Sequence, residues 1–121
     1  MTTQEATSPS ASSLYEQTKD LVENSKALSL SLHQNGQTQA QIQKEISKIT
    51  LAFQTEIAAD KALSNEAKRK AALSRRLDAD EAYQEFELQL EALKNEAALM
   101  TIDLQYTRDL IKVNLAFAQQ S

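Results

Sequence analysis

Few side chains in this 121-residue sequence have the types and spacing that catalysis or metal binding needs. The only histidine is His33, which stands near the end of a predicted helix, where a protonated imidazole complements the helix dipole. Carboxylate-bridged di-metal bundles use Glu-x-x-His pairs on two helices, but Leu30 occupies the position where such a glutamate would stand. We therefore expect His33 to be a surface or capping residue.

The acidic pair Asp78 and Asp80 has the spacing with which a calcium-binding loop begins. Such a loop needs glycine at its sixth position and glutamate at its twelfth, but the sequence has Tyr83 and Gln89 there. With one glycine and no cysteine, the sequence also offers neither a glycine-rich phosphate loop nor a reactive thiolate. We predict that the protein is not an enzyme, uses no metal or cofactor and takes no small-molecule substrate.

A basic segment is the most distinctive charged feature of the sequence. Five cations fall on one outward side of a predicted helix, and we treat them as an electrostatic partner face: Lys61, Lys68, Arg69, Arg75 and Arg76. An acidic block begins at Asp78, and we expect the two blocks to pair, either within one chain that folds back there or between two copies. Nucleic-acid binding through the basic stripe is a second alternative function, which the net charge of -4 and the lack of interleaved aromatic residues disfavour.

Helices must position these residues, because the sequence has few of the turn-forming residues that sheets need. It contains one Gly and one Pro, whereas hairpins and sandwiches require frequent turn residues. Strong helix formers fill most positions after Ser13. The sequence therefore predicts an all-α protein, with a disordered tail over residues 1–12 and a single helical domain over residues 13–121.

Capping signals divide this domain into three helices, at about 13–34, 38–76 and 79–119. Gly36 supplies a left-handed residue that stops the first helix, and a capping box begins at Thr38. Asp78 and Glu81 form a weaker box, so one helix from residue 38 to residue 118 is the competing interpretation. We expect a helical bundle or a long antiparallel hairpin or coiled coil, completed by oligomerisation.

The last predicted helix carries two apolar rows at three- and four-residue spacing. One row runs from Phe86 to Ile111 and is expected to fold the chain. The second row lies on nearly the opposite side and is the candidate interface: Leu99, Ile102, Tyr106, Leu110, Val113 and Phe117. A strand over residues 100–107 is a disfavoured alternative, because no second strand is available to pair with it.

These features predict a non-enzymatic helical protein–protein interaction module, a homo-oligomeric adaptor, scaffold or chaperone-like subunit, whose partner is itself or another protein. Its alanine-diluted core favours association, because small domains with little apolar area are marginally stable. The alternative function is binding to lipid or granule surfaces through the same row, although a membrane surface is disfavoured by the absence of Trp. The sequence has no recognisable signal peptide or membrane span, so we expect a cytoplasmic location and leave secretion without a cleaved signal open.

Overall fold

The computed structural model describes residues 11–120, which form three helices: α1 (Ala11–Ala59), α2 (Glu66–Ala79) and α3 (Glu81–Gln120). No strand occurs in this range, so the all-α prediction is confirmed, and the alternative strand over residues 100–107 is wrong because those residues lie inside α3. The predicted disordered tail lies outside the described residues, except for its last two positions, which begin α1.

Contacts between the helices group the described residues into two units. The terminal unit pairs residues 11–34 of α1 with residues 97–120 of α3, and the central unit comprises residues 35–96. The prediction of a single helical domain over residues 13–121 stays a prediction. Each unit has its own buried side chains.

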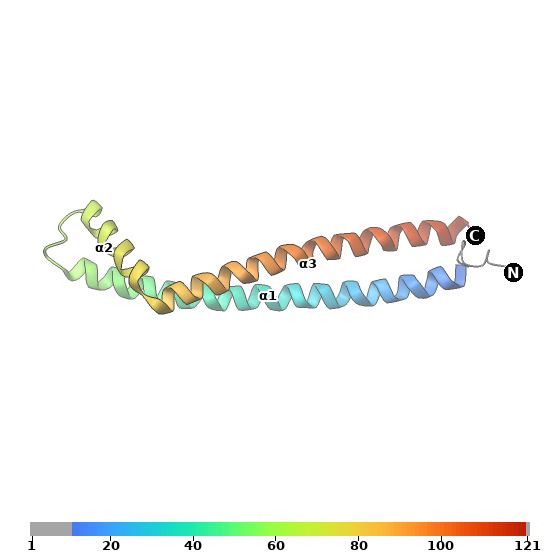
Figure 1. Ribbon diagram of the computed structural model, residues 1–121, viewed down its shortest axis with the longest axis horizontal. Coiled ribbons are helices and arrows are strands. Elements are labelled where there is room, and N and C mark those ends of the chain that lie inside the picture. The colour runs from blue at the N-terminus through green and yellow to red at the C-terminus, as the bar shows by residue number, and fades with distance from the viewer. Residues whose placement is uncertain (1–10, 121) are drawn as a thin grey trace. The chain divides into compact units, whose positions relative to one another are not determined.

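In the terminal unit, the two helices run side by side in opposite directions (Figure 1, blue and red). On α3 they meet along the predicted row, and Leu14 and Leu104 are the buried apolar residues of this seam. Thr18 and Thr107 are buried in the same rows, and each hydroxyl donates to the carbonyl oxygen four residues earlier, at 2.7 and 2.8 Å. The threonines thus satisfy their hydroxyls within their own helix, and few apolar side chains of the seam are fully buried.

In the central unit, the core lies where α1 faces α3. Ile42 and Ile46 of α1 pack with Leu90 of α3, and three partly buried residues of α3 contact this cluster: Tyr83, Phe86 and Leu93. Ile57, near the end of α1, is also buried. The predicted row of α3, from Phe86 onward, therefore marks its contact face with α1 correctly.

The predicted helix ends at residues 34 and 38 are wrong, because α1 continues through Gly36. That glycine has no positive φ, and a Cβ added to it would meet nothing within 4 Å. Asn35 explains the continuity, because its buried amide donates to the carbonyl oxygen of Leu93 at 3.0 Å and accepts from Gln39 at 2.6 Å. Burial of the row on which Asn35 lies outweighs the helix penalty of one glycine, about 1 kcal/mol.

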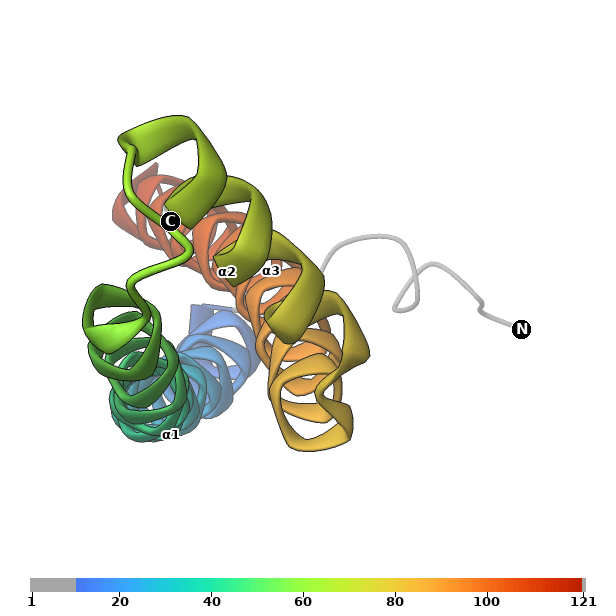
Figure 2. The ribbon, with the colours of Figure 1, turned by 90° about the vertical axis from the view of Figure 1, so that its left-hand side faces the viewer.

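The chain instead reverses between α1 and α2, at residues 60–65, inside the helix predicted over residues 38–76 (Figure 2, green loop). The carboxylate of Asp60 accepts the amide of Ala62 at 2.9 Å, and its carbonyl oxygen accepts the amide of Leu63 at 3.1 Å. Asn65 then caps α2 through its side-chain oxygen. Short polar side chains that bind nearby backbone groups compete with helix continuation, so these two residues end one helix and begin the next.

A single residue, Asp80, separates α2 from α3. The predicted boundary is therefore nearly correct, but the cap is Asp80 rather than Asp78, because the backbone is extended at Asp80, with φ -85° and ψ 114°. Its carboxylate accepts the amide of Tyr83 at 2.7 Å, which satisfies a donor that the first turn of α3 leaves unpaired. The chain bends here and does not fold back near Asp78 (Figure 1), and one continuous helix from residue 38 to residue 118 is excluded.

Candidate interaction surface

The second apolar row of α3 is mostly exposed. We call its six residues the α3 stripe, and five of them, Leu99, Ile102, Tyr106, Val113 and Phe117, are between 48% and 65% exposed. The opposite row, from Phe86 to Ile111, is buried or half-buried at every position. Thus α3 presents one apolar row to α1 and a second apolar row to its surroundings.

Leu110 differs from the other stripe residues, because it is half-buried. It lines a shallow groove between α1 and α3 with Gln17, Asp20, Leu21, Asn24 and Asn114. Leu110 therefore belongs to the edge of the seam in the terminal unit. Its position also shows on which side of that seam the α3 stripe lies.

A second exposed apolar surface lies on α1 and was not predicted. Tyr15, Val22 and Leu30 are exposed on α1, and Lys19 and Lys26 are exposed between them. At 3.6 residues per turn these five positions fall within about a quarter turn of the helix. We call them the α1 outer face. Val22 lies on the flank of the buried row of α1, one position beyond Leu21.

The α1 outer face and the α3 stripe lie on opposite sides of the terminal unit. On α1, the groove residues Gln17, Asp20 and Asn24 stand on one side of the buried row, and the α1 outer face stands on the other. On α3, the stripe adjoins the groove through Leu110. The two apolar surfaces therefore point away from the unit in different directions.

Charged residues accompany both surfaces, and the α1 outer face has the exposed Glu16 and Glu23 beside it as well as its two lysines. Asp103 and Asp109 flank the α3 stripe, one on each side, and both are exposed. The Asp109 carboxylate accepts a hydrogen bond from Gln105 at 2.9 Å. Lys19 and Lys26 stand within the α1 outer face. Within residues 11–120, none of these charged groups forms an ion pair.

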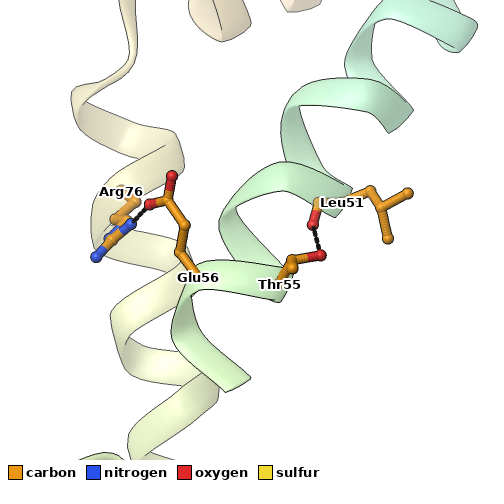
Figure 3. A network of polar contacts seen from close by, with 4 residues as sticks. All are labelled: Leu51, Thr55, Glu56 and Arg76. Carbon is orange, nitrogen blue, oxygen red and sulfur yellow. Dashed lines mark hydrogen bonds and ion pairs between the residues drawn. The ribbon is translucent and has the colours of Figure 1, made fainter. Parts of the chain in front are cut away.

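The basic segment is only partly an open face. Arg76 forms an ion pair with Glu56 of α1 (Figure 3), and its guanidinium lies 5.8 Å from the centre of the Phe53 ring. Arg69 donates to the carbonyl oxygen of Leu63 at 3.2 Å. All five cations are exposed, and Lys61 lies in the turn at residues 60–65 rather than on the predicted helix. Two of the five predicted partner residues are therefore engaged within the central unit.

Within one chain, the expected pairing of this segment with the acidic block after Asp78 does not form among the described residues, and pairing between two copies stays a prediction. Among the described residues, the ion pair that joins α2 to another helix is the one between Arg76 and Glu56. Nearby on α1, the Thr55 hydroxyl donates to the carbonyl oxygen of Leu51 at 2.8 Å (Figure 3). The pairing differs because the chain reverses at residues 60–65, so that α2 packs on the end of α1.

No known protein family, curated protein or solved structure matches this chain. The positions and charges of the described side chains are therefore the basis for any assignment of function.

The structure also bears on His33, on metal binding and on membrane spans. His33 is exposed and lies inside α1 rather than near a helix end, because α1 continues through residue 36. Across residues 11–120, no cluster of three or more His, Asp or Glu side chains is arranged to hold a metal ion. No helix in the same range combines the length and apolar character that crossing a membrane requires.

Proposed function

We propose that this chain is a non-enzymatic helical protein–protein interaction module that associates through the α3 stripe, as a homo-oligomeric cytoplasmic adaptor, scaffold or chaperone-like subunit. The observation that carries this proposal is the exposure of five large apolar side chains, at 48–65%, along a helix whose opposite row is buried. Helices recognise one another through such rows. Each Å² of apolar surface that a partner covers contributes about 25 cal/mol.

The composition of the terminal seam supports the same conclusion. Leu14 and Leu104 are the apolar residues buried there, while Thr18 and Thr107 occupy two further buried positions. Helices in proteins gain most of their stability from packing of an apolar face, and few side chains of this seam are fully buried. A partner on the α3 stripe would add the apolar burial that the seam lacks.

The direct test changes the middle of the stripe. The double variant Ile102→Asp with Tyr106→Asp should lower the mass of the associated species in sedimentation velocity, because two charges would have to be buried in the contact. Both side chains are exposed, so helix content by circular dichroism should stay within about 10% of wild type. Leu110 is unsuitable for this test because it is half-buried against α1.

The matched control carries aspartate at Thr101 and Gln105, which are exposed polar positions of α3 with the same spacing. This control should retain the wild-type mass. A wild-type chain that stays monomeric at micromolar concentration, and whose cross-links to other proteins are unchanged by the stripe variant, would rule out the proposed function.

A lipid or granule surface is the alternative occupant of the stripe. The aspartates at 103 and 109 disfavour it, because peripheral helices that bind anionic lipid carry Lys or Arg beside their apolar face. Co-sedimentation with phosphatidylserine and phosphatidylcholine vesicles separates the two models. Vesicle binding that Phe117→Asp abolishes would favour the lipid model over association between proteins.

Nucleic-acid binding through the basic segment is a weaker alternative. Arg69 and Arg76 bind groups within the chain, so two of the five cations are already engaged. Binding to nucleic acid would have to weaken steeply with salt and be lost in Arg75→Glu with Arg76→Glu. A flat salt response would remove this candidate.

A further inference from the structure

We propose that Asn35 and Gly36 form a deamidation site, which the pairing of α1 with α3 keeps unreactive. Gly36 is the one glycine of the chain, so Asn35 is the one asparagine that a glycine follows. When the two helices separate at this point, Asn35 becomes reactive, and the product prevents them from pairing again in the same way. This inference is independent of the proposed function, because the site lies in the central unit and the α3 stripe lies in the terminal unit.

The reaction joins a backbone group of one residue to the side chain of the residue before it. The backbone nitrogen of Gly36 loses its proton and attacks the side-chain carbonyl carbon of Asn35, so that a nitrogen–carbon bond forms and ammonia leaves with that proton. Water then opens the resulting cyclic imide at one of its two carbonyl groups, which leaves aspartate or isoaspartate at this position. Glycine suits the attack because it has no Cβ to hinder it and adopts non-helical conformations freely.

The structure holds the reacting groups apart. Gly36 lies inside α1 without a positive φ, and closing the imide ring requires a backbone ψ outside the helical range. In an α-helix the amide of each residue donates to the carbonyl oxygen four residues before, which engages the attacking nitrogen. Asn35 is 6% exposed, and its side chain donates to the carbonyl oxygen of Leu93 and accepts from Gln39. The closed pair of helices therefore blocks both the nitrogen and the carbon.

Release of this block depends on the packing around Leu93. That side chain contacts the cluster of Ile42, Ile46 and Leu90, in which α1 packs against α3. Parts of a folded protein open with free energies that range up to that of global unfolding. Because deamidation is slow compared with such opening, its rate in the folded protein should equal the rate in the unfolded chain multiplied by the open fraction. The rate at Asn35 thus measures how often the two helices separate here.

The product does not fit the closed pair. A carboxylate has no N–H group to donate, so it would face the carbonyl oxygen of Leu93 as a buried and unpaired charge, which is costly. Isoaspartate also adds a carbon atom to the backbone of α1, which interrupts the hydrogen bonds of the helix. One opening that ends in deamidation therefore makes the separation of α1 from α3 permanent.

Peptide mapping by mass spectrometry tests the site in the full chain at neutral pH. In guanidinium chloride above the unfolding midpoint, Asn35 should convert at least about fivefold faster than each of the other asparagines, which are Asn24, Asn65, Asn95 and Asn114. In native buffer the rate at Asn35 should fall at least about tenfold. Gly36→Ala should slow the conversion at least about tenfold in the denaturant, because the methyl group hinders the attack.

A cavity in the cluster tests the dependence on helix pairing. Leu90→Ala should raise the native rate at Asn35 at least about threefold and leave the rate in guanidinium chloride unchanged. If Leu90→Ala fails to fold, Ile46→Val supplies a smaller cavity. The control is Leu88→Ala at an exposed position of α3, which should change neither rate. The dependence would be overturned by equal rates in native buffer and denaturant, or by a cavity variant whose amides near Leu93 exchange faster while its deamidation does not.

The variant Asn35→Asp tests the consequence of deamidation. It should accelerate amide hydrogen exchange near Leu93 at least about tenfold, or lose the folded state altogether. Asn95→Asp introduces the same change at an exposed position of the central unit and should exchange as the wild type does. A wild-type exchange pattern in Asn35→Asp would show that the product is tolerated and would overturn the permanent separation. Conversion of Asn35 no faster than that of Asn24 in the denaturant would remove the site itself.

Discussion

Asn35 in α1 donates a hydrogen bond from Nδ2 to the carbonyl oxygen of Leu93 in α3, with 3.0 Å between the two atoms. Its own side-chain oxygen accepts from Gln39 at 2.6 Å, and the residue is buried. In helical pairs, a buried asparagine fixes the register of the two helices at some cost in stability, because only one alignment satisfies the amide. Asn35 thus specifies how α1 and α3 pair in the central unit.

Replacing Asn35 separates stability from register. Asn35→Ala should lower the free energy of unfolding by about 1–3 kcal/mol, because it leaves a cavity and removes both hydrogen bonds. Asn35→Leu should keep or raise the stability and should broaden the amide resonances of residues near Leu93, since several alignments become acceptable. Urea denaturation and heteronuclear NMR measure these two effects. Gln41→Ala, at an exposed position of the same helix, should change neither.

Substitution at Gly36 tests whether α1 is continuous. Gly36→Ala should stabilise the protein by about 0.5–1 kcal/mol, because the glycine is helical, has space for a methyl group and lowers helix stability. Thermal denaturation measures the change. The reverse substitution at a neighbouring exposed position, Ala40→Gly, should cost about 1 kcal/mol. A loss of stability in Gly36→Ala would indicate a left-handed residue and a helix that ends there.

The attachment of α2 should depend on Arg76. None of the 14 residues of α2 is buried, and Arg76 supplies both the ion pair with Glu56 and the contact with the Phe53 ring. Because these groups are largely exposed, Arg76→Ala should lower the global stability by no more than about 1 kcal/mol. Amide hydrogen exchange within α2 should accelerate, since local opening no longer breaks this ion pair and ring contact. Arg75→Ala, one position along and without that contact, should leave the exchange rates unchanged.

Tyr83 gives the central unit a dependence on alkaline pH. Burial raises the pKa of its phenol above the ordinary value of 10.0, and the carboxylates of Glu87 and Asp78 raise it further. Since the folded state holds this proton more tightly than the unfolded state, the stabilisation is complete below pH 10 and decreases as pH rises toward the folded pKa. Between about pH 9 and 11, the melting temperature of Tyr83→Phe should therefore fall less than that of the wild type. Equal losses in the two proteins would contradict this assignment.

The sequence indicates the contact faces more reliably than the helix ends. Periodic spacing identifies the buried row of α3 and the exposed stripe opposite, because helical geometry converts spacing into a face directly. The ends depend on competition between local hydrogen bonds and burial. Gly36 has the residue type of a helix stop but lies next to a buried asparagine, whereas Asp60 and Asn65 stop and restart the chain where the apolar row weakens.

The candidate surface was only half predictable for a related reason. The α3 stripe stands out because its residues are large and closely spaced, whereas the α1 outer face has three apolar residues separated by lysines. Such a pattern has the appearance of an ordinary solvated flank. Its significance depends on which side of α1 packs against α3, and that is a tertiary property that spacing alone does not supply.

From Leu14 to Phe53, the residues of α1 at alternating steps of four and three are buried or half-buried without interruption. This regularity restricts how the gene for such a chain can change in length. Inserting or deleting one codon in α1 would rotate every later side chain by about 100° and move its buried row into water. Changes of seven codons nearly restore the phase. We therefore expect length variants of α1 to differ by whole heptads.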